Sequence, residues 1–305
     1  MVNTCTSLKR RMTKQIFLKI IKVGCLIFAM VVFLAALYHR QVYSENCTGL
    51  NDWKVENCGY IDNPAIEENS GLVHVKKDLF WTHNDDEDYN LYLITLKGKT
   101  RYRWPVKIQN NDWEDITADS NGHLFIGNFG NNFNLRRKVS IWKLDPYERN
   151  RVYPIIIHYQ EQGDFSPPIP GLMNFDVEGM VYHEDSLYLF TKNKNEQGFN
   201  VYAVADKPGH ANPKIRQSVS IKGMVTGACL SPDHKELALL TYQRIYFFKM
   251  EPGFRIAKTP FNCIPIWRGR QMEAISWFRS DSILVSNEQR DLFLISKKKY
   301  KSIPE

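Results

Sequence analysis

The sequence predicts an all-β domain, a five-bladed β-propeller, preceded by one N-terminal transmembrane helix. Helical periodicity is almost absent after residue 60, where short runs rich in Val, Ile, Tyr, Phe and Trp alternate with turns rich in Gly, Asn, Asp and Pro. These runs form a repeat, and one long apolar run lies near the N-terminus. Together the three observations predict the fold class.

Each repeat opens with a four-residue start that leads into the first strand. A polar turn, a second apolar strand and a third strand follow, and in the first four repeats a fourth strand follows as well. The intervals between successive starts are 44, 64, 48 and 47 residues, and the long interval contains a Pro-rich excursion at residues 160–171. Four antiparallel strands at this period are typical of a propeller blade. The starts are NSGL (69–72), WEDI (113–116), VEGM (177–180), VTGA (225–228) and MEAI (272–275).

The last repeat is too short for four strands, so the segment 52–60 is expected to supply its fourth strand and to close the ring. Six blades remain the structural alternative, because about 50 residues per repeat is generous for five.

The N-terminal 40 residues carry seven basic residues and no acidic residue, whereas the other 265 balance at 33 basic and 33 acidic residues. Residues 23–38 contain no charge, and residues 16–38 are long enough to span a bilayer. The expected organisation is a cytoplasmic basic tail (1–15), a signal-anchor helix (16–38), a linker (39–51) and the propeller domain (52–305). A cleaved signal peptide remains the alternative.

The basic cluster precedes the apolar run, so the N-terminus is expected to be cytoplasmic and the propeller extracytoplasmic. That compartment is the periplasm in a bacterium, and the lumen or the extracellular space in a eukaryote. A disulfide between Cys47 and Cys58 is an open possibility there. Nucleic acid is excluded as a partner, because the domain has no excess of basic residues.

The second residue of each start is expected to face the central channel, because the innermost strands of a propeller line its axis. Several carboxylates in a narrow channel repel one another unless a cation compensates them. Oxygen ligands that carry several negative charges suit Ca²⁺, and the absence of His and Cys from the set argues against zinc and copper. The predicted calcium ligands are Ser70, Glu114, Glu178, Thr226 and Glu273.

With this order of ligands, the chain resembles the calcium-activated nucleotidase (apyrase) family of five-bladed propellers. The resemblance implies a channel-bound calcium at those five positions, hydrolysis of nucleoside di- or triphosphates at the same mouth, and a single N-terminal anchor. Residues 124–130 (LFIGNFG) look like the family's strand and glycine turn, whereas Thr226 stands where the family has Ser. WEDI and FDVEGM are also similar to a bacterial group of uncharacterised esterase-like, phytase-like propellers.

Polar residues at the ends of the second strands are expected to surround the mouth of the channel. Asp85 or Asp86 would orient an attacking water, and His83 is the candidate proton carrier. The candidate substrate-binding residues are Asn128, Lys192, Lys194, Arg244 and Arg290. No P-loop, HExxH motif or Ser-His-Asp elbow occurs.

These observations favour a membrane-anchored, calcium-dependent hydrolase of phosphoanhydrides or esters that acts on a small anionic molecule. Two alternatives remain open, because the fold alone does not separate them. One is a non-catalytic propeller with a structural ion, whose mouth binds a ligand or a protein. The other is a calcium-dependent esterase or lactonase.

Overall fold

The computed structural model describes residues 52–148, 151–163, 174–266 and 271–298, together with helical residues 23, 24, 26–31 and 33. The chain divides into two compact units, Met1–Cys47 and Thr48–Glu305. No helix within the described residues is long and apolar enough to cross a membrane. The predicted basic tail, the linker and most of the predicted span lie outside the described residues.

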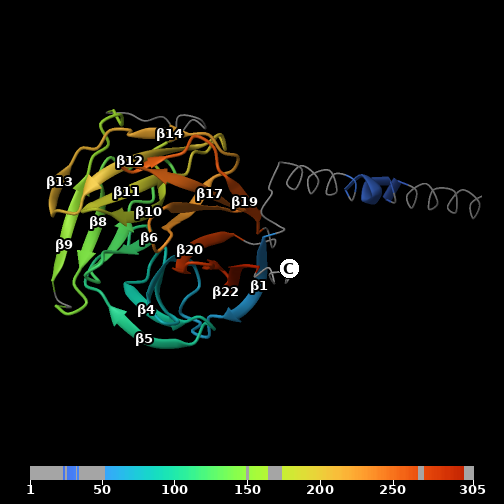
Figure 1. Cartoon of the computed structure of the whole chain (residues 1–305), viewed down its shortest axis with the longest axis horizontal. Helices are drawn as coiled ribbons and strands as arrows, with labels where there is room; N and C mark the ends of the chain where they lie inside the picture. The colour runs from blue at the N-terminus through green and yellow to red at the C-terminus, as the bar shows by residue number, and fades with distance from the viewer. Residues whose placement is uncertain are drawn as a thin grey trace, which may run out of the picture. The chain divides into compact units, whose positions relative to one another are not determined.

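The second unit consists of five sheets arranged around one axis (Figure 1). The first blade contains β2 (Asn69–Lys76), β3 (Leu79–Asn84), β4 (Asn90–Thr95) and β5 (Thr100–Pro105). The second contains β6 (Trp113–Ala118), β7 (Leu124–Asn128), β8 (Val139–Leu144) and β9 (Val152–Ile157), with β13 (Gly209–Ala211) parallel to β9.

The third blade contains β10 (Val177–His183), β11 (Ser186–Thr191), β12 (Phe199–Ala205) and β14 (Gln217–Val219). The fourth contains β15 (Val225–Leu230), β16 (Glu236–Thr241), β17 (Arg244–Glu251), β18 (Arg255–Ile256) and β19 (Asn262–Pro265). The fifth contains β20 (Met272–Arg279), β21 (Ser282–Asn287), β22 (Asp291–Lys297) and β1 (Trp53–Tyr60).

The innermost strands form a closed ring, because β2, β6, β10, β15 and β20 each contact the next and β20 contacts β2. Each of these strands begins at the first residue of a start that the sequence identified. The described part of the chain therefore forms five blades, as predicted, and the six-bladed alternative is wrong for it.

Strand β1 closes the ring as predicted, pairing antiparallel with β22 so that Trp53 lies opposite Lys297. The N-terminal strand of the domain thus completes the C-terminal blade, which leaves the last sheet with four strands. A closed ring protects the blade edges that an open sheet would expose.

Hydrophobic clusters fill the spaces between neighbouring blades. One cluster joins the fourth and fifth blades and includes Trp53, Phe247 and Trp277, whose side chains are almost fully buried. Similar clusters join the first blade to the second, the second to the third, and the fifth to the first. The alternation of apolar residues along each strand supplies both faces of these interfaces.

The structure answers the question of a disulfide between Cys47 and Cys58, which the sequence left open. Cys58 is a free, buried thiol whose Sγ donates to the carbonyl of Leu96 at 3.5 Å. Cys229 is also free, and it is half-buried. Cys263 is disulfide-bonded. A bridge between Cys47 and Cys58 is therefore excluded.

Replacing Trp53 tests the closure of the ring. Trp53 is 5% exposed and stacks on Phe247 with ring centroids 5.1 Å apart. We expect Trp53→Ala to lower the free energy of unfolding of the full-length protein by about 3–5 kcal/mol in chemical denaturation, because a large cavity would separate β1 from the fourth blade. Tyr60→Ala is the control, since Tyr60 lies on the same strand at 47% exposure. It should cost about 1 kcal/mol or less. Equal losses would contradict the role given to β1.

Candidate metal centre in the axial cavity

A register shift interrupts every innermost strand just after it begins. In four blades one residue lies unpaired between two paired ones, and this residue is Glu114, Glu178, Thr226 or Glu273. In the first blade the unpaired residue is Gly71, next to Ser70, and its backbone is left-handed with φ of 52°. A bulge bends the strand and re-aims a side chain. The bulges therefore account for the three glutamates that turn out of the sheets toward the axis.

The axial cavity has a volume of about 200 Å³ and receives residues from all five blades. Five acidic residues and one lysine line it. The lining residues are Ser70, Asp85, Glu114, Asn132, Glu178, Lys192, Tyr242, Gln271, Glu273 and Glu288. Four of the five predicted calcium ligands therefore share one cavity, and Thr226 lies outside its lining.

One group of three carboxylates includes Asp176, which is not among the predicted calcium ligands. Oxygen atoms of Glu114, Asp176 and Glu178 all lie within 4.8 Å of one another, and all three residues are buried. Two oxygens bound to one Ca²⁺ ion are at most about 4.8 Å apart, twice the metal–oxygen distance of about 2.4 Å, so the three oxygens satisfy the distance limit for a shared cation. The donor set is made of oxygens alone, so it fits a hard divalent cation.

Burial and mutual repulsion raise the pKa values of these carboxyl groups. Desolvation is the main cause for Glu114, whose pKa is well above its usual range, and the charges of Glu178 and Asp112 add to it. The pKa of Glu273 is also raised well above its usual range, by desolvation and then by Glu178. The ionised form of these carboxyl groups is therefore unfavourable in the cavity, and a bound cation would stabilise it.

Two lysines already compensate part of this charge. Lys192 Nζ lies 2.7 Å from Glu178 Oε1, and both side chains are less than 10% exposed. Desolvation lowers the pKa of Lys192, but Glu178 and the other carboxylates raise it well above its usual value. Lys194 Nζ lies 2.9 Å from Asp176 Oδ2 and donates to Asn132 Oδ1 at 2.7 Å. Both lysines are predicted substrate-binding residues, and both contact carboxylate oxygens; Lys192 lines the cavity, whereas Lys194 lies outside its lining.

The two hydroxyl positions of the predicted ligand set join neighbouring blades. Ser70 Oγ donates to the carbonyl of Glu114 at 2.6 Å, and Thr226 Oγ1 donates to the carbonyl of Met272 at 2.6 Å. Each bond links the innermost strand of one blade to that of the next. A third link comes from Asp115, whose Oδ2 accepts from the backbone nitrogen of Met180 at 2.7 Å.

Gly130, in the loop after β7, lies against two carboxylate side chains and has no side chain of its own to displace them. A Cβ atom at this position would lie 2.1 Å from Glu114 Oε1 and 2.4 Å from Asp112 Oδ2. Only a glycine therefore leaves room for these two carboxylates as they stand. Gly130 ends the segment LFIGNFG that the sequence analysis singled out.

The predicted catalytic residues occupy three different environments. Asp85 lines the cavity, and burial together with the adjacent carboxyl group of Glu68 raises its pKa to about 8. Asp86 is exposed and accepts from the backbone nitrogen of Glu87. His83 is fully buried outside the cavity lining, and burial lowers its pKa to about 4. Its ring packs edge-on against Trp113.

The other predicted substrate-binding residues lie outside the axial cavity. Arg244 is buried, and its Nη1 donates to the hydroxyl of Tyr246 at 3.3 Å. Arg290 packs over the ring of Tyr60 at 4.9 Å. Asn128 lines a separate cavity in the second blade.

A pattern in the sequence could have identified Asp176 and its counterpart Asp112. Each stands two residues before a glutamate of the ring, in the sequences DWE (112–114) and DVE (176–178). Alternate residues of an extended chain point to the same side, so a second acid two positions earlier adds to the same face. Glu288 follows the second strand of its blade, where the sequence predicts polar residues around the mouth, whereas Tyr242 and Gln271 carry no comparable signal.

The chain matches no protein-family model, and no curated protein matches it in sequence. Similar solved structures include a streptogramin B lyase, 8% identical, with 81% of this chain and 99% of that one covered and a TM-score of 0.44. A gluconolactonase from Xanthomonas campestris is 9% identical, with 82% and 91% covered and a TM-score of 0.46. The PQQ-bound aldose sugar dehydrogenase of Streptomyces coelicolor is 7% identical, with 81% and 98% covered and a TM-score of 0.46. Such low similarity supports no statement about function.

Removing Lys192 tests whether its ammonium group holds the carboxylates together. In EDTA we expect Lys192→Met to lower the free energy of unfolding by about 3 kcal/mol, because Glu178 would lose its partner beside Glu114 and Glu273. Adding Glu178→Gln to this variant should restore part of the loss, since it removes the uncompensated charge. Lys235→Met is the control, because the Lys235 side chain is 79% exposed. Chemical denaturation gives the free energy of unfolding of the unsubstituted protein, the two single variants and the double variant. A double variant that is less stable than Lys192→Met would contradict the role given to Lys192.

Proposed function

We propose that this protein is a single-pass, membrane-anchored β-propeller whose axial cavity binds a divalent cation, calcium. The observation that carries the proposal is the group formed by Glu114, Asp176 and Glu178, whose oxygens lie within 4.8 Å of one another and are buried. Lys192 is the only basic residue among the ten that line the described cavity, against five acidic ones. The acidic residues of the cavity therefore outnumber its one basic residue, and a hard divalent cation would neutralise the excess negative charge.

We further propose that the bound cation serves the hydrolysis of a phosphoanhydride or an ester. A divalent cation in such a site would polarise the oxygen of the scissile group and lower the pKa of a bound water. Among the described residues that line the cavity, Asp85 is the proposed proton acceptor, because its pKa is raised to about 8 and it can take up a proton near and above that pH. The resemblance to calcium-activated nucleotidases supports a phosphoanhydride, and the resemblance to esterase-like propellers supports an ester.

A non-catalytic propeller with a structural ion is the second candidate. Two observations favour it. The hydroxyl groups of Ser70 and Thr226 are engaged in hydrogen bonds between blades, and His83 is buried outside the cavity lining. In that case the ion would stabilise the ring, and the mouth would bind a small anionic molecule or a protein.

The proposed topology places the N-terminus in the cytoplasm and the propeller on the other side of the membrane. The seven basic residues before and around the apolar run support this orientation. The disulfide-bonded Cys263 supports it too, because disulfides persist in oxidising compartments.

Thermal melting of the full-length protein in detergent tests the cation. We expect calcium in about hundredfold excess over its dissociation constant to stabilise the fold by about 2.7 kcal/mol and to raise the midpoint by about 5 °C or more relative to EDTA. Glu178→Gln should abolish most of this shift, because it removes a negative ligand. Glu184→Gln is the control, since the Glu184 side chain is 83% exposed. If calcium does not raise the melting midpoint of the unsubstituted protein, the axial cavity does not bind calcium.

Product assays separate hydrolysis from binding. Phosphate release from ADP, GDP and UDP tests the phosphoanhydride, and release of the phenol from aryl acetates tests the ester. We expect turnover of one class with calcium, and a loss of at least about tenfold in Asp85→Asn, which lacks the proton acceptor. Asp86→Asn is the control, because Asp86 is exposed and outside the cavity lining. If neither class turns over although calcium raises the midpoint, the non-catalytic function is the correct one.

A further inference from the structure

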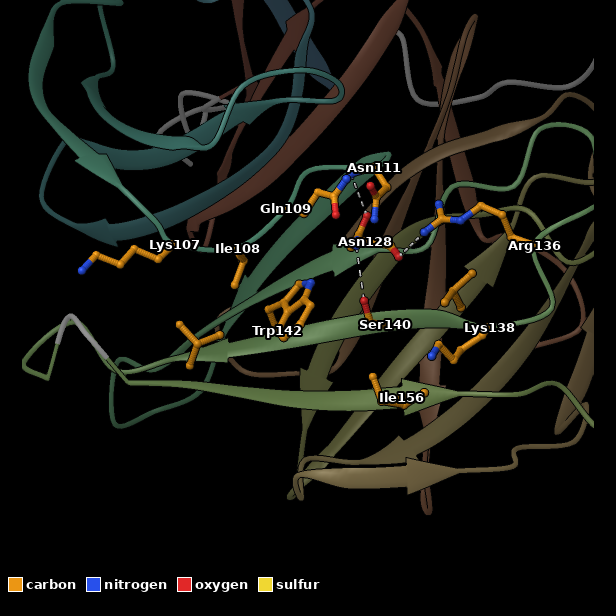
Figure 2. A pocket seen from close by; sticks show the side chains of 12 residues that line it. Lys107, Ile108, Gln109, Asn111, Asn128, Arg136, Lys138, Ser140, Trp142 and Ile156 are labelled. Atoms are coloured by element: carbon orange, nitrogen blue, oxygen red, sulfur yellow. Dashed lines mark hydrogen bonds between the residues drawn. The ribbon is translucent and has the colours of Figure 1, made fainter.

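A second cavity, of about 460 Å³, lies in the second blade between strands β7, β8 and β9 and the segment that precedes β6 (Figure 2). We call it the side cavity. Its volume is that of a site for a small organic molecule. No acidic residue is among those that line it, in contrast to the axial cavity.

One end of the side cavity is polar and positive. Lys138 is exposed, points toward Ser140, and forms no ion pair with any described residue (Figure 2). Asn128 lies beside Ser140, with its Nδ2 3.3 Å from the Ser140 Oγ. Arg136 fixes the wall behind them, because its guanidinium group donates to the carbonyl of Asn128 at 3.1 Å and to that of Gly130. At this end an anionic group could contact the ammonium group of Lys138 and the neutral polar side chains of Ser140 and Asn128.

The other end of the side cavity contains a flat ring and apolar side chains, with the exposed Lys107 next to Ile108 (Figure 2). Trp142 lies near Ile108 (Figure 2), and both Trp142 and Val152 pack against the hydrophobic cluster between the first and second blades. Trp142 Nε1 is a buried donor with no acceptor among the described residues. An indole ring at the edge of a cavity offers a flat surface for a second flat group.

The loop between β7 and β8 connects the two cavities. Asn132 of this loop lines the axial cavity, whereas Arg136 and Lys138 line the side cavity. Arg136 Nη1 also lies 3.8 Å from Asp112 Oδ2, and a Cβ at Gly130 would touch both Asp112 and Glu114. Arg136 thus lines the side cavity while its guanidinium group contacts Asp112.

We propose that the side cavity binds an aryl anion, a molecule with one phosphate or carboxylate group and one flat aromatic group. The anionic group lies at Lys138, Ser140 and Asn128, and the aromatic group lies against Trp142. The inference goes beyond the proposed function and does not depend on it, because none of the predicted metal ligands lines the side cavity.

Calorimetric titration of the full-length protein in phosphatidylcholine nanodiscs tests the proposal, with EDTA present so that no metal contributes. The probes are 1-naphthyl phosphate and 1-naphthoate, with 1-naphthol and inorganic phosphate as the two halves of the ligand. We expect one or both aryl anions to bind at least about tenfold more tightly than either half. Failure of both to bind up to about 1 mM, or equal binding by one of the halves, would overturn the proposal.

Variants assign the binding to the side cavity. Lys138→Glu should weaken the aryl anion at least about tenfold, because it replaces the cation with a like charge. Trp142→Leu should do the same by removing the flat surface. Lys138 is exposed, so its variant is expected to fold even if Trp142→Leu does not. Lys235→Glu is the matched control on an exposed turn, and Glu178→Gln should leave the binding unchanged. Unchanged binding in Lys138→Glu would overturn the assignment.

Discussion

The repulsion among carboxylates gathered at the axis is the interaction on which the rest of this structure depends. Glu114, Glu178 and Glu273 enter one cavity of about 200 Å³ from three different blades. Desolvation raises the pKa of each of them, and the charge of Glu178 raises the pKa values of Glu114 and Glu273 further. Protonation or a nearby positive charge relieves this repulsion, and Lys192 and Lys194 supply positive charge from the ends of the second strands.

The fold explains how so much charge can be concentrated there. Closure of the ring by β1 holds the innermost strands in fixed positions, and the hydrogen bonds of Ser70, Thr226 and Asp115 tie each of three strands to the next one. The hydrophobic clusters lie between the blades, away from the axis. The apolar contacts therefore stabilise the domain, while the axis is left for polar chemistry.

Much of this architecture could be predicted from the sequence, because repeated segments form strands at equivalent positions in successive blades. All five starts begin an innermost strand, and the segment 52–60 became β1. The repeat could not show which polar residues after the strands reach the axis. Lys192 reaches it, whereas Arg290, at the corresponding end of the fifth blade, packs over Tyr60. Loop conformation decides between such outcomes, and the strand pattern carries no information about it.

The bulge at the beginning of each innermost strand has a consequence for how this chain tolerates changes of length. Around Glu114, Trp113 pairs with Asn128 and Asp115 pairs with Gly127, so one residue is extra on this strand. An in-frame loss of that single codon would restore uninterrupted pairing and leave the hydrophobic face of β6 in register. The blade would survive while the axis lost a charged group. Insertions and deletions of one residue, usually ruinous in a strand, could at these positions alter chemistry without altering architecture.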